Sequence, residues 1–153
     1  MNNINKKEYE ALLGNETHIN ALLANSTAYI NEFVNDLNWV GYYLNEDNVL
    51  YLHTFQGKIA CSKIPFDRGV CGYAAREQKV VVVDDVHQFK DHIACDANSK
   101  SEIVLPIMVN NKVFGVLDID APVVNRFDQK LVSDLTEFAE FISKQIQKIQ
   151  KTS

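Results

Sequence analysis

A chain of 153 residues with 46% hydrophobic residues can form one globular domain around a single core and is too apolar for a disordered protein. Its formal net charge of −5 and its pI of about 5.3 argue against non-specific nucleic-acid binding, which needs a basic surface. No apolar run approaches the roughly 20 residues that span a bilayer and no apolar signal segment follows the N-terminus, so we expect a cytoplasmic protein without a membrane partner.

Three cysteines, Cys61, Cys71 and Cys95, are an odd number and do not suit a disulfide framework in a chain expected to be cytoplasmic. They suit structural thiols, a metal site or a redox centre. A free cysteine is most often a small buried hydrophobe, and Cys71, among small residues of a predicted helix, fits that role best. Cys61 and Cys95 fit it less well because each lies beside polar loop residues.

Two helices are predicted before residue 38. The first covers Lys6–Leu13 and stops at a Gly-Asn pair, and Thr17 is expected to cap the second. The second carries apolar residues at steps of three, four and seven, namely Ile19, Leu22, Leu23, Tyr29, Ile30, Phe33, Val34 and Leu37. These residues form one stripe, so this helix is expected to pack against another layer.

An antiparallel hairpin is predicted from Asn38–Leu44 and Val49–Phe55, because two apolar and aromatic runs flank a turn rich in Asn and acidic residues. Side chains alternate across a strand, so Trp39, Gly41 and Tyr43 share one face. The missing side chain between two rings suggests a gap that can hold a small apolar group. On pattern alone, the two aromatic residues are more typical of plain core.

The middle of the chain alternates short elements with polar loops. We predict a short helix at Val70–Gln78, a strand at Val80–Val83 and an irregular loop at Asp96–Ser101. Cys95 lies just before this loop, and Glu102 follows it where a buried apolar strand begins. A thiol on a loop beside an acid at the mouth of a strand is a place where sulfur chemistry is feasible.

The last two strands are predicted at Ile103–Val109 and Lys112–Asp120, joined by an Asn-Asn pair that tolerates the positive φ of a tight hairpin. Alternation places Val113, Gly115, Leu117 and Ile119 on one face and Phe114, Val116, Asp118 and Asp120 on the other. Two ionised carboxylates on the same face repel each other, and aspartate is depleted in strands, so the pair favours a functional role. Their crowding raises their pKa values, and a protonated carboxyl can donate to an oxygen.

A final helix is expected after Pro122, capped by Asp128 and carrying an apolar stripe that ends at Ile149. Its stripe consists of Phe127, Leu131, Leu135, Phe138, Ile142, Ile146 and Ile149. Helices at both ends of the chain surround five or six strands that are mostly joined by hairpins. This order predicts an α+β fold in a single domain spanning residues 1–153.

Two other kinds of cysteine site are alternatives to a redox centre. A zinc site would gather Cys61, Cys71, Cys95 and His92, but structural zinc sites usually contain close cysteine pairs, which this chain lacks. A protease-like pair would join Cys95 to His92 or His87. Such partners are neighbours in space rather than in sequence, so the spacing neither supports nor excludes the pair.

The chain resembles the free methionine-(R)-sulfoxide reductases, a family of single GAF domains, over nearly its whole length. The resemblance rests on six stretches, which are Asn38–Tyr43, Phe55–Cys61, Arg68–Gly72, Asp91–Asp96, Ser101–Pro106 and Gly115–Asp120. A GAF fold alone says little about function, because most GAF domains only bind ligands. Three cysteines at matching places together with three acids are far more specific.

The resemblance implies a central antiparallel sheet with the N- and C-terminal helices on one face and the ligand pocket on the other. It also implies that Cys95 attacks the sulfoxide sulfur, which releases methionine and leaves a sulfenic acid. Cys61 would then form a disulfide with Cys95, and thioredoxin would reduce it with electrons from NADPH. Cys71 would act as an alternative or relay thiol. A second thiol in reach prevents over-oxidation to sulfinic acid.

Roles for the pocket residues also follow from the resemblance. Trp39 and Tyr43 would hold the methyl end of the substrate, and Glu102, Asp118 and Asp120 would surround the sulfoxide oxygen. A sulfoxide is a poor electrophile until its oxygen is protonated or hydrogen-bonded. Acids in an apolar pocket can keep one proton at neutral pH and deliver it as general acids.

The main chain around Ile93 and Ala94, before Cys95, would bind the amino and carboxylate ends of the amino acid. The resemblance implies no bound cofactor and no metal, and terminal amphipathic helices suggest a homodimer. Two other functions fit the same fold. One is a non-catalytic GAF sensor for a small ligand, and the other is a thiol-based oxidant sensor that uses the cysteines without the acids.

Overall fold

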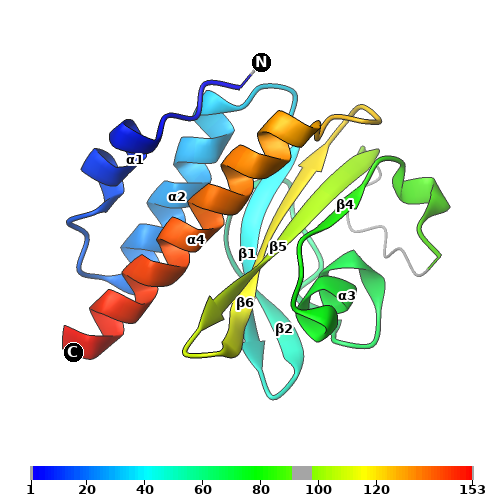
Figure 1. Ribbon diagram of the computed structural model, residues 1–153. Helices are drawn as coiled ribbons and strands as arrows, with labels where there is room; N and C mark the ends of the chain where they lie inside the picture. The colour runs from blue at the N-terminus through cyan, green and yellow to red at the C-terminus, as the bar shows by residue number, and fades with distance from the viewer. Residues whose placement is uncertain (1, 91–97, 153) are drawn as a thin grey trace.

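The computed structural model describes residues 2–90 and 98–152, which form one six-stranded antiparallel sheet covered by helices on both faces (Figure 1). The strand order is β3-β2-β1-β6-β5-β4. Helices α1, α2 and α4 cover one face, and the short helix α3 lies on the other (Figure 1). This confirms the expected α+β arrangement, with both terminal helical segments on the same face.

The helices follow the predicted positions closely. They are α1 (Lys6–Leu13), α2 (Ile19–Phe33), α3 (Gly69–Glu77) and α4 (Gln129–Thr152), with a 3-10 turn η1 at Val86–Gln88. The predicted cap Asp128 is confirmed, because its carboxylate accepts the N–H of Leu131 at 2.9 Å. Thr17 as a cap is wrong. The N-cap position is His18, and the carboxylate of Glu16 accepts the free N–H groups of Thr17 and His18 instead.

The strands are β1 (Trp39–Glu46), β2 (Val49–Gly57), β3 (Lys63–Pro65), β4 (Val81–Val83), β5 (Ser101–Val109) and β6 (Lys112–Ala121). Both predicted hairpins are present. The β5–β6 turn has φ angles of 52° at Asn110 and 64° at Asn111, in the left-handed region that asparagine tolerates. The β1–β2 turn is tighter than expected, because Asp47 and Asn48 alone make it with positive φ angles.

The alternation predicted for the last strand is wrong at its beginning. The register shifts by one residue between Ile107 and Met108, so Ile107 pairs with Gly115 while Met108 pairs with Val113. Phe114 is the extra residue of a bulge. As a result, Val113 packs in the same cluster as Val116, and Phe114 packs against the helix-covered face. Beyond the bulge the predicted alternation holds.

Two hydrophobic clusters lie on opposite faces of the sheet. The helix-side cluster contains every residue of the predicted α4 stripe, all less than 9% exposed. The pocket-side cluster is smaller and includes Trp39 and Tyr43 from β1 with Val70 and Cys71 from α3. Within the described ranges, no helix is both long and apolar enough to cross a membrane.

Candidate active site

The three acids predicted for the site lie together on the face of the sheet that α3 covers. In the antiparallel register, Asp120 on β6 lies directly between Trp39 on β1 and Glu102 on β5. The next row on the same face places Asp118 opposite Gly41. Directly opposite side chains on neighbouring strands are within contact distance. The register therefore joins the acids to one another and to the aromatic residues of β1.

This acid cluster, defined as Glu102, Asp118 and Asp120, is almost excluded from water. Glu102 and Asp118 are each 6% exposed, and Asp120 is 9% exposed. Among the buried residues that the structure describes, none is a lysine, arginine or histidine. Ionised carboxylates are costly to bury beside one another, so a proton on one of them lowers the free energy of the cluster.

The pKa of Glu102 indicates that this residue holds the proton. Burial raises the pKa of its carboxyl group well above the usual value of 4.5, and the negative charges of Asp118 and Asp120 raise it further. Hydrogen bonds to the same two aspartates act in the same direction. Glu102 is therefore a protonated donor at a pH where an exposed glutamate is ionised.

Cys71 lies against this cluster, close to Glu102 and Asp118. It is a free thiol in the first turn of α3 and is 3% exposed. Burial raises the pKa of Cys71 well above its usual value, and the charge of Asp118 and a hydrogen bond to it add to the effect. A thiol in this setting stays protonated, whereas a nucleophilic cysteine is a thiolate.

The metal site weighed from the sequence does not form as proposed. Cys61 is disulfide-bonded, and His92 and Cys95 lie outside the described residues. The structure gathers a different set, in which one ligand atom each of Cys71, Glu102 and Asp118 lies within 4.8 Å of the others. One thiol and two carboxyl groups are a donor set that zinc accepts.

An aromatic wall, made of Trp39, Tyr43 and Phe55, flanks the acid cluster. The Trp39 ring stacks on Tyr43 at a centroid distance of 5.9 Å and on Phe55 at 5.3 Å. The predicted gap at Gly41 is filled, which corrects the sequence-based interpretation. A Cβ at Gly41 would collide with Phe55 and with the Trp39 ring, so the glycine makes room for these rings and not for a ligand.

The polar atoms of Trp39 and Tyr43 hold a segment that we call the strap, Lys58–Cys61. The indole N–H of Trp39 donates to the carbonyl of Lys58 at 3.1 Å, and the Tyr43 hydroxyl donates to the carbonyl of Cys61 at 2.9 Å. Burial raises the pKa of Tyr43, and the charge of Asp118 raises it further, so the phenol remains a donor. The same side chains that wall the site therefore also tie down Cys61.

Three residues predicted to bind substrate or react with it, Ile93, Ala94 and Cys95, lie outside the described residues. The described chain on the C-terminal side of these residues is anchored to the site. Asn38 donates from its side-chain amide to the Ser99 hydroxyl at 3.0 Å, although 61 residues separate them. Sequence reasoning missed this contact, and no local pattern signals it. His87, the other base considered for Cys95, is exposed.

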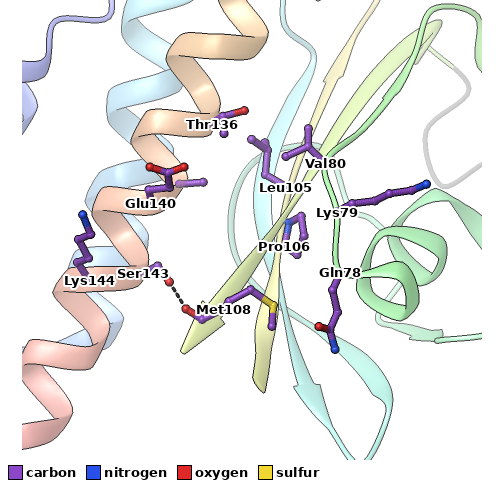
Figure 2. A pocket seen from close by; sticks show the side chains of 11 residues that line it. Gln78, Lys79, Val80, Leu105, Pro106, Met108, Thr136, Glu140, Ser143 and Lys144 are labelled. Atoms are coloured by element: carbon purple, nitrogen blue, oxygen red, sulfur yellow. Dashed lines mark hydrogen bonds between the residues drawn. The ribbon is translucent and has the colours of Figure 1, made fainter. Parts of the chain in front are cut away.

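A second hollow lies away from the acids, between α4 and β5 (Figure 2). Its lining includes Lys79, Glu140 and Lys144, and Ser143 on its floor donates to the carbonyl of Met108. It contains no cysteine and none of the predicted site residues. We therefore assign the candidate active site to the acid cluster and the aromatic wall.

The chain is similar to known proteins in sequence and in fold. The GAF domain family model matches residues 16–147. A protein of Escherichia coli named free methionine-R-sulfoxide reductase is 53% identical over 121 residues, which cover 79% of this chain and 73% of the relative. The chain belongs to the free methionine-R-sulfoxide reductase family of GAF domains.

Two solved structures of this family contain a substrate. The Staphylococcus aureus fRMsr complex with substrate is 50% identical with a TM-score of 0.87, and the match covers 92% of each chain. The Neisseria meningitidis free methionine-R-sulfoxide reductase in complex with its substrate is 38% identical with a TM-score of 0.91, covering 96% of this chain and 89% of that one. Membership of this family makes the protein an oxidoreductase, as the sequence analysis expected.

Proposed function

We propose that this protein reduces free methionine (R)-sulfoxide to methionine. The observation that carries the proposal is the buried acid cluster beside the aromatic wall. The proposal is also supported by a relative that is named free methionine-R-sulfoxide reductase. The cluster and the wall together offer one acidic side for a polar oxygen and one apolar side for a methyl group. A sulfoxide sulfur carries both groups.

Glu102 is the proposed proton donor to the sulfoxide oxygen. Its raised pKa keeps it protonated at a pH where an exposed glutamate is ionised, and hydrogen bonds to Asp118 and Asp120 hold that proton within the acid cluster. As the sulfur–oxygen bond weakens, negative charge develops on the oxygen. A donor already in place stabilises that charge and supplies the proton, which is general-acid catalysis.

Cys95 is the proposed nucleophile. Its thiolate attacks the sulfoxide sulfur, the oxygen ends on the cysteine sulfur as a sulfenic acid, and methionine leaves with two electrons more than the sulfoxide had. Cys61 then attacks the sulfenic sulfur, which forms the Cys61–Cys95 disulfide and releases water. The disulfide-bonded state of Cys61 and the free thiol of Cys71 support this choice of resolving cysteine. A thioredoxin dithiol, itself reduced with electrons from NADPH, returns both cysteines to thiols, and no bound cofactor is required.

Substrate recognition follows the two sides of the hollow. Trp39 and Tyr43 are proposed to contact the methyl group, and the main chain around Ile93 and Ala94 to bind the amino and carboxylate ends. Methyl and oxygen would thus face different walls, so the R configuration at sulfur fits and the S configuration does not. When methionine sulfoxide is part of a peptide, the chain on either side of it would clash with the protein, so we expect only the free amino acid to bind.

A coupled assay tests this function directly. Purified protein, thioredoxin, thioredoxin reductase and NADPH are mixed with separated R and S sulfoxides, each free and in a peptide. We expect NADPH consumption only with the free R form and none with Cys95→Ser. Tight binding of the free sulfoxide without turnover would instead support the ligand-sensor function. Re-oxidation by peroxide but not by sulfoxide would support the oxidant sensor.

Two further expectations stay proposals. A homodimer predicts a sedimentation-equilibrium mass twice that of the chain, although the apolar stripe of α4 is already buried within one chain. A cytoplasmic location is consistent with dependence on a dithiol reductant, because free thiols persist in reducing compartments. Fractionation of cells that express the tagged protein would check it.

A further inference from the structure

The strap is held by hydrogen bonds, by contacts of Ala60 and Cys61 with the pocket-side cluster, and by the disulfide of Cys61. It leaves β2 after Gly57, whose φ of 139° lies in a region that favours glycine, and it rejoins the sheet through a bond from the Leu52 N–H to the Ser62 carbonyl. Between these points Ile59 is 92% exposed, so its side chain contributes nothing to the core. Once the disulfide is reduced, the main chain at Cys61 is held by that packing and by the few donors that reach the strap.

Two of those donors come from the aromatic wall, and their own positions are rigid. Trp39 is 2% exposed and Tyr43 is 1% exposed, and their rings stack on each other. The Tyr43 hydroxyl reaches the carbonyl of Cys61 itself, while the Trp39 indole reaches the other end of the strap. A buried donor in a packed ring fixes its acceptor better than a mobile surface group would.

We infer that the Tyr43 hydroxyl positions Cys61 for resolution of the sulfenic acid, a role separate from that of the Tyr43 ring as a wall for the methyl group. This inference rests on the proposed function. The step is Cys95–SOH plus Cys61–SH giving the Cys61–Cys95 disulfide and water. The Cys61 thiolate supplies the electron pair, and hydroxide leaves and takes up a proton. Tyr43 is thus a positioning residue for this step, since its hydroxyl contacts the Cys61 backbone and not the sulfur.

Tyr43→Phe tests the inference because it keeps the ring and removes only the hydroxyl. Reduced protein is mixed with free methionine (R)-sulfoxide, and samples quenched over time are assayed for methionine, for remaining thiols and for sulfenic acid trapped by dimedone. We expect the rate of disulfide formation, relative to the rate of methionine formation, to fall about fivefold to tenfold, the usual effect of one lost hydrogen bond. Sulfenic acid then accumulates on Cys95.

Tyr42→Phe is the matched control. Tyr42 neighbours Tyr43 on β1, but its hydroxyl lies on the helix-covered face and bonds the Ser26 hydroxyl at 2.8 Å. Loss of that hydroxyl also costs one buried hydrogen bond, and we expect it to leave the ratio of the two rates unchanged. Circular dichroism of both variants checks that they fold. If Tyr43→Phe does not fold, Trp39→Phe, which releases the other end of the strap, provides the same comparison and is expected to lower the same ratio.

The outcomes separate this inference from the proposed function. If the wild type forms no methionine, the proposed function fails. If the wild type forms methionine but dimedone traps no more sulfenic acid in Tyr43→Phe than in Tyr42→Phe, the proposed function is supported and the positioning role of Tyr43 is refuted. An equal slowing of methionine formation and disulfide formation would also refute it, because it would assign the hydroxyl to substrate binding.

The exposure of Ile59 carries a second inference. It is the most exposed large hydrophobic side chain among the described residues and lies two positions before the disulfide-bonded Cys61. A protein dithiol that attacks the Cys61 sulfur must approach the strap, where Ile59 is exposed. We propose that Ile59 is a docking contact for the thioredoxin-type reductant, which also rests on the proposed function.

Ile59→Ser tests this contact, with Leu12→Ser as the matched control. Leu12 is also a large exposed apolar residue, at 63%, but it lies on α1 on the opposite face of the sheet. We expect Ile59→Ser to raise the KM for thioredoxin about tenfold and to leave turnover with dithiothreitol unchanged, because a small reductant needs no docking surface. An unchanged KM, or an equal rise in Leu12→Ser, would overturn the inference.

Discussion

At the scale of single residues, the distinguishing feature of the site is that two buried acidic groups stay protonated. Glu102 and Cys71 both have raised pKa values, and in both cases burial is the largest cause and neighbouring acids add to it. Two groups that are commonly negative or reactive are therefore neutral donors here. This explains how an acidic cluster persists on a face of the sheet that also buries a hydrophobic cluster.

Glu102→Gln is expected to lower kcat by about 100-fold or more, because glutamine can hydrogen-bond the sulfoxide oxygen but cannot transfer a proton. KM for the sulfoxide should change much less, since shape and contacts are kept. Stopped-flow measurement of the first turnover separates the chemical step from recycling. A variant with the wild-type rate would show that the acid is not the proton donor.

The same residue predicts a trend of stability with pH. A carboxyl group with a raised pKa binds a proton in the folded protein at a pH where the unfolded chain has lost it, so its favourable contribution is complete below pH 4.5. That contribution disappears as pH rises through the folded-state pKa. Urea unfolding should therefore show a free energy of unfolding that declines less with pH in Glu102→Gln than in the wild type. Glu140→Gln, at an exposed position on α4, is the control.

Cys71 and Cys61 are predicted to differ in their role in disulfide formation. Because its thiol is buried, protonated and next to Asp118, Cys71→Ser is expected still to form the Cys61 disulfide after one turnover. Cys61→Ser is expected to stop at the sulfenic acid. Thiol counting and mass spectrometry of alkylated peptides distinguish the two. Loss of disulfide formation in Cys71→Ser would restore the relay role that the resemblance implied.

At the scale of elements, hairpins and caps decide where the chemistry-bearing residues lie. The Asn110–Asn111 turn and the bulge at Phe114 together set the register of β5 against β6, and that register puts Glu102 beside Asp120. The bulge at Phe114 occurs before the acids, so Asp118 and Asp120 keep the alternation expected of them. A slip of one residue would move both acids to the helix-covered face.

The N-cap of α4 provides a stability test that does not involve the site. Asp128→Ala removes the acceptor for the Leu131 N–H and should lower the free energy of unfolding by about 1 kcal/mol. Asp128→Asn keeps an acceptor at that position and should cost clearly less. Urea denaturation monitored by circular dichroism compares the two, and equal losses would mean that the hydrogen bond is not what stabilises the helix start.

At the scale of the whole molecule, the sheet separates a structural core from a reactive one. The helix-side cluster holds large aromatic contacts, such as Phe138 against Tyr9 at 4.8 Å between centroids. Among the residues that the structure describes, it contains none of the predicted catalytic ones. The pocket-side cluster holds the aromatic wall and Cys71. Stability and specificity are thus assigned largely to different faces.

Neighbouring residues on β6 test this division. Val116 and Leu117 are both fully buried, but Val116 lies opposite Tyr43 in the pocket-side cluster and Leu117 lies opposite Tyr42 in the helix-side cluster. Val116→Ala and Leu117→Val should each cost on the order of 1–2 kcal/mol of stability. Only Val116→Ala should change KM for the sulfoxide. Equal changes in KM would show that the faces are coupled.

The sequence by itself determined the main helices and hairpins and, apart from the start of β6, the faces of their residues. The apolar stripe of α4, the Asn-Asn hairpin and the shared face of Asp118 and Asp120 all depend on contacts within a few residues, which helical and strand periodicity encode. The cap at Asp128 belongs to the same class. These features are local, so composition and spacing were enough to predict them.

Only the tertiary structure decided which of these residues meet. The contact of Cys71 with Asp118, the filled space at Gly41 and the tie from Tyr43 to Cys61 join segments far apart in the chain. Such contacts depend on strand register, on where α3 docks and on the path of the strap after Gly57. Those are set by packing of the whole core, and no local pattern of residues records them.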